Sequence, residues 1–176
     1  MTLLETKHFG KLSYEADSEL DFPLGLPGFE DRKRFVAVHF VENDPLIYLQ
    51  SLEDPALCFI TMPVLAIDPQ YRLNVSGEDL GRLGLNSARQ PRVGDDVMCL
   101  SVLSISETGP TANLLAPILL NLRNRKALQA VAPGSDYSHQ FALMPQEAMP
   151  QEAMPQEAMP QEALPQEALP QEALPQ

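Results

Sequence analysis

A chain of 176 residues is long enough to bury the core of one domain, and its formal net charge of −12 argues against general affinity for nucleic acid or anionic lipid. Cys58 and Cys99 lie far apart in apolar stretches and form no CxxC motif, so we expect buried, reduced thiols and a cytosolic protein. Charge appears early, at Glu5, so we expect no signal peptide.

The first part of the chain predicts short β-strands separated by turn residues. Two strands are expected within residues 3–15, on either side of Gly10. Two more are predicted at 35–41 and 46–52, because β-rich runs flank a turn of Asn, Asp and Pro. A further β-rich run covers residues 56–62.

Helix signals are sparse in this sequence. One helix is predicted at residues 76–85, where Ser76 can cap the first turn with Asp79 three positions on, and Gly84 can end the helix. A short helical turn is also expected at 30–34.

Residues 96–106 predict a long strand whose alternating positions are Val97, Cys99, Ser101, Leu103 and Ile105. The pair Asp95–Asp96 is interpreted as a solvated strand start rather than a metal site. Many short strands with Gly and Pro in the turns predict a mainly β fold, a small antiparallel barrel-like domain or sandwich with one short helix.

The segment Thr111–Lys126 places a proline inside an apolar run. Its apolar part is far shorter than the roughly 20 residues of a membrane-spanning helix. Pro117 cannot donate to a β-ladder, so a strand must break, bulge or lie at an edge there. The strand resumes at 118–122, and we expect three side chains to be largely buried: Leu114, Ile118 and Leu120. The following basic residues indicate an exposed hairpin tip, with an RNA contact as the alternative: Arg123, Arg125 and Lys126.

Residues 144–176 repeat the pentads MPQEA and LPQEA. A proline at every fifth position excludes a continuous α-helix, at about 3 kcal/mol for each interior proline. We therefore predict a folded domain at 1–143 and a disordered, extended tail at 144–176. Without the six glutamates of the tail, 18 acidic and 12 basic side chains leave the domain a net charge of −6. The tail is interpreted as a docking segment or acidic spacer, or as a repeat expansion without a role.

Catalytic motifs are not found in the sequence: it contains no P-loop, HExxH, GxSxG or GxGxxG pattern. The three histidines lack the spacing of metal ligands; His8 is expected in a loop and His39 half-buried in a strand. Asp136, Ser138 and His139 are neighbours in sequence, whereas the members of a catalytic triad converge from separate elements. We predict a protein that is not an enzyme and needs no cofactor or metal.

Four segments occur together in one order: FPLGLPGFED (22–31), YLQSLEDPALCFI (48–60), TANLLAPILLNLRNRKALQ (111–129) and SDYS (135–138). In that order, and at about this spacing, they resemble the bacterial flagellar assembly factor family, FliW. The resemblance runs from about Glu5 to Leu143. The pentad tail departs from it, since members of the family usually end shortly after the last segment.

This resemblance implies a small, cytoplasmic, β-barrel-like protein that binds flagellin and the translational regulator CsrA, an RNA-binding dimer that represses flagellin translation. In that family, flagellin occupies the assembly factor until the flagellin is exported. The freed factor then binds CsrA beside the RNA-binding surface of CsrA and antagonises CsrA allosterically. We do not expect direct binding to nucleic acid or membranes. We expect the protein to be a monomer. The alternative is a generic small β-barrel module that binds a ligand or another protein.

The candidate partner-binding residues are Pro27, Gly28, Phe29, Glu30, Gln50, Asn113, Pro117 and Asn121. The Pro- and Gly-rich loop could display Phe29 as an anchor for a partner; packing of Phe29 into the core is the alternative. Asn113 and Asn121 flank the break at Pro117, where their amides could satisfy backbone groups or leave an edge open to a partner strand. The acidic domain would suit a partner with a basic surface.

Overall fold

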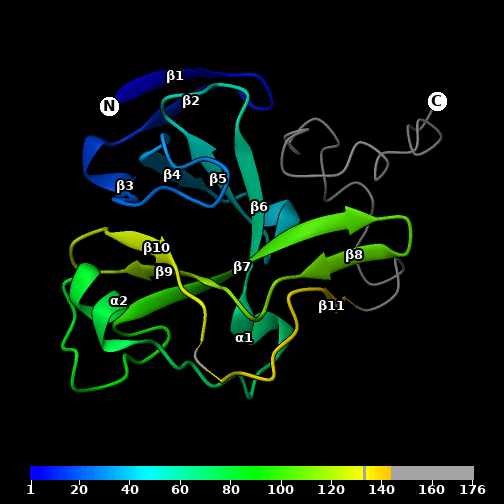
Figure 1. Ribbon diagram of the computed structural model, residues 1–176. Coiled ribbons are helices and arrows are strands. Elements are labelled where there is room, and N and C mark those ends of the chain that lie inside the picture. Colours follow the sequence, from blue (N-terminus) through cyan, green and yellow to red (C-terminus); the bar gives the residue numbers. More distant parts are fainter. Residues whose placement is uncertain (133, 144–176) are drawn as a thin grey trace.

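The structure is a computed structural model that describes residues 1–132 and 134–143. This part of the chain is mainly β-structure (Figure 1). The strands are β1 (Thr2–Thr6), β2 (Gly10–Tyr14), β3 (Glu19–Asp21), β4 (Arg34–Val38), β5 (Ile47–Ser51), β6 (Cys58–Pro63), β7 (Val97–Ser106), β8 (Gly109–Ala112), β9 (Ile118–Asn121), β10 (Ala127–Gln129) and β11 (Phe141–Ala142). The helices are α1 (Val64–Ile67) and α2 (Gly77–Arg82), with 3-10 turns η1 (Ala16–Ser18) and η2 (Val41–Asn43).

The main sheet is antiparallel throughout and follows the order β10-β9-β7-β6-β5-β4-β3. Strand β8 pairs with the far half of β7 and with β11, whereas β1 and β2 form a separate hairpin. One isolated bridge joins the two ends of the row: it pairs Asp21 of β3 with Lys126, directly before β10, and the Asp21 N–H donates to the Arg125 carbonyl at 3.0 Å. The predicted mainly β, antiparallel fold is confirmed, but the sheets are open apart from that bridge, so the fold is barrel-like only in a loose sense.

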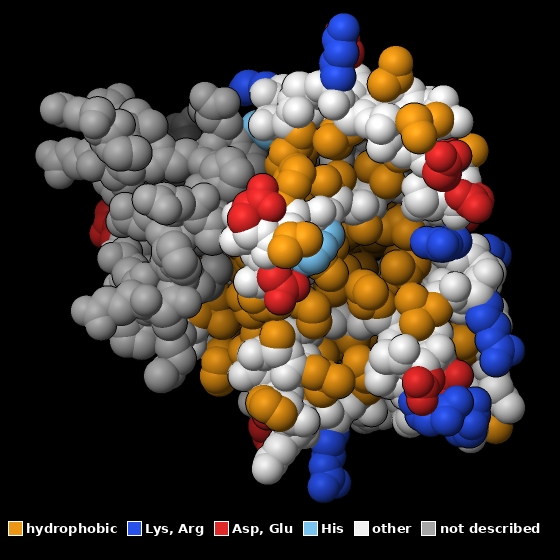
Figure 2. All heavy atoms as spheres, turned by 180° about the vertical axis from the view of Figure 1, so that it is seen from behind, with side chains coloured by type: hydrophobic (Ala, Val, Ile, Leu, Met, Phe, Trp, Pro, Cys, Tyr) orange, Lys and Arg blue, Asp and Glu red, His pale blue; other side chains and the backbone are white. Residues whose placement is uncertain are grey.

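Side chains on the two faces of the main sheet enter different hydrophobic clusters, because successive residues of a strand point to opposite sides. Phe35, Leu49 and Phe59 belong to a cluster that the loop before β4 covers. Tyr48, directly before Leu49 on β5, and Ile60, directly after Phe59 on β6, belong to a second cluster. Figure 2 shows hydrophobic side chains gathered across the middle of the rear face, where the surface is hollowed.

Strand β7 pairs with two successive segments, with β9 through residues 97–100 and with β8 through residues 103–106. Between β8 and β9, residues 113–117 leave the ladder, so the predicted break at Pro117 is confirmed. Three side chains around the break are at most 5% exposed, as predicted: Leu114, Ile118 and Leu120. The basic residues that follow lie in the exposed turn between β9 and β10, which confirms the hairpin.

The predicted helix is present as α2, and the Ser76 hydroxyl accepts the Asp79 N–H at 3.1 Å. Gly84, at φ 74°, follows its last turn. The described residues hold a second helix, α1, which the sequence did not indicate because one turn of four residues is too short to show a period. The helical turn predicted at 30–34 is wrong: residues 30–31 form a turn and β4 begins at Arg34.

Among the polar residues, the expectation for His39 is wrong, and that for the pair Asp95–Asp96 holds for Asp95 alone. His39 lies beyond the end of β4, is exposed, and contacts the Asp44 carboxylate at 3.0 Å. Asp95 is exposed, as expected, whereas Asp96 is only 8% exposed, and its carboxylate accepts hydrogen bonds from the Arg92 N–H at 2.9 Å and the Arg92 Nε at 3.3 Å. By contrast, His8 lies in the turn between β1 and β2, as expected.

Both thiols are buried and free, as predicted, and burial raises the pKa of Cys58 and of Cys99 to about 12. No helix of the described residues is long and apolar enough to cross a membrane. Within the same residues, no three His, Cys, Asp or Glu side chains are grouped as metal ligands would be. The pentad tail lies outside the described residues.

Candidate partner-binding groove

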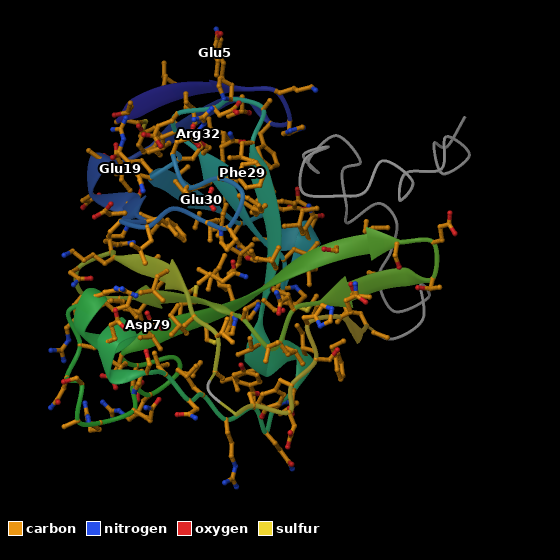
Figure 3. The ribbon with its side chains drawn as sticks, viewed as in Figure 1. Glu5, Glu19, Phe29, Glu30, Arg32 and Asp79 are labelled. Atoms are coloured by element: carbon orange, nitrogen blue, oxygen red, sulfur yellow. The ribbon has the colours of Figure 1, made fainter. Side chains whose placement is uncertain are left out.

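The loop between β3 and β4 folds back on the sheet because its glycines allow tight turns. Gly25 has φ 66°, and a Cβ there would lie 2.6 Å from the Glu30 Cα, so no other residue fits without movement. The Phe29 N–H then donates to the Leu26 carbonyl at 2.7 Å. This turn places Phe29 against the first cluster, half-buried (Figure 3), with its ring centroid 5.2 Å from that of Phe59 on β6.

A groove of about 370 Å³ opens beside Phe29. Its lining comes from the loop, from β6 and β7, from the segment around the strand break, from β10 and from the end of the described chain: Leu26, Pro27, Phe29, Phe59, Val102, Ser104, Thr111, Asn113, Gln129, His139 and Gln140. We call this site the groove. Three of the four segments that resemble the FliW family contribute to it directly, and the fourth ends immediately before His139.

Hydrogen bonds fix the polar side of the groove. The Asn113 Oδ1 accepts the Ala116 N–H at 3.0 Å, and the Gln129 Nε2 donates to the Ala116 carbonyl at 2.9 Å. Ser101 holds the same segment from β7, since its hydroxyl donates to the Asn113 carbonyl at 2.8 Å. Side chains therefore satisfy both backbone groups of Ala116 at the break, and the position of this segment is set before any ligand binds.

The segment Ser135–Ser138 is anchored to the strand break from the other side. The Ser138 carbonyl accepts the N–H groups of Leu114 and Leu115 at 3.0 and 3.2 Å. Tyr137 stacks on Tyr71, with ring centroids 4.3 Å apart. These contacts hold the chain where His139 and Gln140 can line the groove.

The chemistry of the groove suits an uncharged or apolar segment of a partner. Its lining combines apolar side chains with neutral hydrogen-bonding groups, and none of the lining residues is an Asp, Glu, Lys or Arg. One acidic residue lies beside it: Glu30 is exposed on the loop, and the hydrogen bond that its carboxylate accepts from the Gly28 N–H lowers its pKa. The arrangement offers an apolar anchor pocket with one acidic side chain beside it.

Comparison with known proteins assigns the family. The model of the FliW protein family matches residues 3–143. The chain belongs to the FliW family. Among its relatives are flagellar assembly factors FliW from Syntrophomonas wolfei, 32% identical over 73% of this chain and 80% of the relative, and from Treponema pallidum, 36% identical over 76% and 85%. A crystal structure of the flagellar assembly factor FliW superposes with a TM-score of 0.69 at 28% identity, covering 83% of this chain and 99% of that one.

The structure separates the predicted partner-binding residues into several places. Pro27, Phe29 and Asn113 line the groove, and Gly28 and Glu30 lie on the loop beside it.

The remaining predicted residues lie away from the groove. Gln50 is fully buried, and its Nε2 donates to several carbonyls, among them Leu57 at 3.1 Å. Pro117 is buried directly before β9. Asn121 is 2% exposed, and its Nδ2 donates to the Leu83 carbonyl at the end of α2 at 2.8 Å.

Sequence reasoning missed several groove residues, among them Val102 and Ser104 of β7, Gln129 of β10 and His139. Residues 102 and 104 point to the face opposite the buried alternation of Val97, Cys99 and Ser101. The alternation itself could have indicated them, because every second residue of a long strand points to the face opposite the buried one.

Proposed function

We propose that this member of the FliW family is a non-enzymatic, cytoplasmic regulator that binds flagellin and CsrA and relieves CsrA repression of flagellin translation by exchange between the two partners. Binding of flagellin would also make it a flagellin chaperone. The observation that carries the proposal is the convergence of the family's segments on one preformed groove.

The groove supports protein binding for a physical reason. Its apolar side chains, Leu26, Phe29, Phe59 and Val102, are held by the first cluster and lose little freedom on binding. A central apolar anchor with a polar border is the arrangement found at binding hot spots. The net charge of −6 on the domain favours encounter with a basic surface, which an RNA-binding regulator must possess.

The test is a titration of the protein into a labelled complex of CsrA with the flagellin leader RNA, followed by addition of flagellin. The RNA should be released in the first step and rebound in the second. Direct binding of the RNA by this protein, or release that flagellin cannot reverse, would contradict partner exchange.

A matched pair of variants tests the groove itself. Ser104→Arg fills the groove with a charged side chain, whereas Ser13→Arg places the same change on an exposed position of β2. Ser104→Arg should weaken the binding of at least one partner by about tenfold or more, which corresponds to about 1.4 kcal/mol, and Ser13→Arg should leave both unchanged. Equal affinities for the two variants, with both folded by circular dichroism, would exclude the groove as the contact site.

A further inference from the structure

The basic side chains of the domain are unevenly distributed. Six of the 12 lie in or next to α2, in the loop before β7 and in the β9–β10 turn: Arg82, Arg89, Arg92, Arg123, Arg125 and Lys126. We call these residues the basic corner. The same segments hold four acidic residues, so they carry a net charge of +2, whereas the rest of the domain, with 14 acidic and six basic residues, carries −8. Figure 2 shows Lys and Arg side chains along one side of the rear face.

A second pocket, of about 350 Å³, lies within the basic corner. The pocket is lined by Arg89, Arg123 and Asp96, by the polar side chains of Asn86, Asn121 and Asn124, and by the apolar Leu85 and Pro91. The Asp96 Oδ2 already accepts hydrogen bonds from the Arg92 N–H and Nε, which leaves the guanidinium groups of Arg89 and Arg123 to hold a second carboxylate. The pocket is separate from the groove, since no residue lines both. Guanidinium groups beside neutral amides and a small apolar wall are suited to a carboxylate on a short aliphatic stem.

The walls of this pocket are held in place. The Nδ2 atoms of Asn121 and Asn124 both donate to the Leu83 carbonyl, at 2.8 and 2.9 Å. A Cβ on Gly84 would lie 2.8 Å from the Asn124 Nδ2, so the turn after α2 packs directly on the hairpin.

Several charges of the corner still lack a close partner. Arg82 pairs with Glu78 and Asp79, and Arg92 pairs with Asp95 and Asp96. The nearest carboxylate oxygen to Arg89, on Asp96, is 3.8 Å away. The other three basic residues form no ion pair with any residue in 1–132 and 134–143: Arg123, Arg125 and Lys126. The corner therefore has hydrogen-bond donors available for carboxylates.

We propose that the pocket of the basic corner is a carboxylate-binding site whose occupant is the chain's own pentad tail, residues 144–176. Charge complementarity supports this occupant, because the tail carries six glutamates and no basic residue. Length supports it as well, since 33 residues at about 3.1 Å each reach about 100 Å, against a radius of gyration of about 14 Å for a domain of this size.

The contact is intramolecular, multivalent and weak. A tethered glutamate is present at an effective concentration of the order of millimolar, and the six equivalent glutamates compete for the same arginines. Each exposed ion pair contributes little, so the tail exchanges rapidly on and off the corner. The site goes beyond the proposed function and does not depend on it, because the groove lies elsewhere.

The first experiment compares two full-length chains by amide NMR at low salt, the natural chain and one with all six tail glutamates changed to glutamine: E147Q, E152Q, E157Q, E162Q, E167Q and E172Q. The amide signals of Arg89, Arg123 and Asn124 should shift between the two chains, while those of the β1–β2 hairpin stay in place. Added salt of about 1 M should abolish the difference, because the Debye length falls to about 3 Å. Identical signals at low salt, or shifts spread over the whole domain, would overturn the proposal.

The second experiment adds a fluorescent peptide of residues 144–176 to the full-length six-glutamine chain and measures anisotropy. Arg89→Ala with Arg123→Ala should weaken peptide binding by about three- to tenfold. The matched control, Lys7→Ala with Lys11→Ala, removes two exposed charges from the β1–β2 hairpin and should not weaken it. Equal loss in both pairs would show a general charge effect, and tighter binding of a flagellin-leader RNA than of the peptide would assign the corner to nucleic acid; either result refutes the proposed occupant.

Discussion

The ring of Phe29 packs edge-on against the ring of Phe59, with a centroid separation of 5.2 Å and an angle of 83° between the planes. Phe29 comes from an irregular loop, and Phe59 is the second residue of β6. The contact therefore gives Phe29 two roles at once: it closes one side of the first hydrophobic cluster and forms one wall of the groove.

Phe29→Ala should lower the free energy of unfolding by about 1–3 kcal/mol, less than the roughly 3–5 kcal/mol of a fully buried phenylalanine, because Phe29 is only half-buried. Partner binding should fall as well. Phe35→Ala is the control, since Phe35 is 0% exposed in the same cluster. It should cost more stability in urea denaturation and leave the affinity of the folded fraction unchanged. The opposite ranking would show that Phe29 is a purely structural residue.

Ile118→Ala should destabilise the domain by about 2–5 kcal/mol, because Ile118 is 1% exposed and its truncation leaves a cavity beside the break at Pro117. Chemical denaturation followed by circular dichroism measures the change. If the variant kept its stability and lost a partner instead, this segment would be a binding site first and a structural element second.

The contribution of Asp96 to the stability of the fold should depend on pH in the acid range. Hydrogen bonds from the Arg92 N–H and guanidinium lower the pKa of this carboxylate below the value of about 3.9 expected in the unfolded chain. The stabilisation is fully present above pH 3.9 or so and is lost as the pH falls through the lowered pKa of the folded state. The difference in melting temperature between the natural chain and Asp96→Asn should therefore be constant near neutral pH and shrink in acid. A difference that did not change with pH would mean that the charge of Asp96 contributes nothing.

Limited proteolysis should remove residues 144–176 first and leave the domain intact, since a Pro-rich repeat offers a protease exposed backbone. At about 1 M salt, where charge contacts are screened, the melting temperature of the trimmed product should match that of the full chain. A drop of several degrees on trimming would show that the tail packs on the domain through apolar contacts.

Association with CsrA should slow as salt rises from about 0.1 M to about 1 M, because the Debye length shrinks from about 10 Å to about 3 Å and the attraction between an acidic domain and a basic partner is screened. Under the proposal that CsrA binds in the groove, dissociation depends on short-range contacts there and should change much less. Surface plasmon resonance separates the two rates. An association rate independent of salt would show that the net charge of −6 on the domain has no part in the encounter.

The sequence by itself determined the features that depend on neighbouring residues. The alternation in β7, the Ser76 cap of α2 and the break at Pro117 each rest on the backbone chemistry of a few adjacent positions, and each prediction is confirmed. The family resemblance could also be found from sequence, because each of its four segments is a run of consecutive residues.

The tertiary structure alone decided which polar side chains are free to meet a partner. Asn121 looks like a surface residue in sequence, but it is 2% exposed, and its Nδ2 donates to the carbonyl of Leu83, which lies 38 residues away along the chain. The groove likewise forms only when the loop at Phe29 and the chain near His139 meet across more than a hundred residues. The physical reason is that burial removes water from both partners of a contact at once, so the position of each group depends on residues that local sequence patterns do not contain.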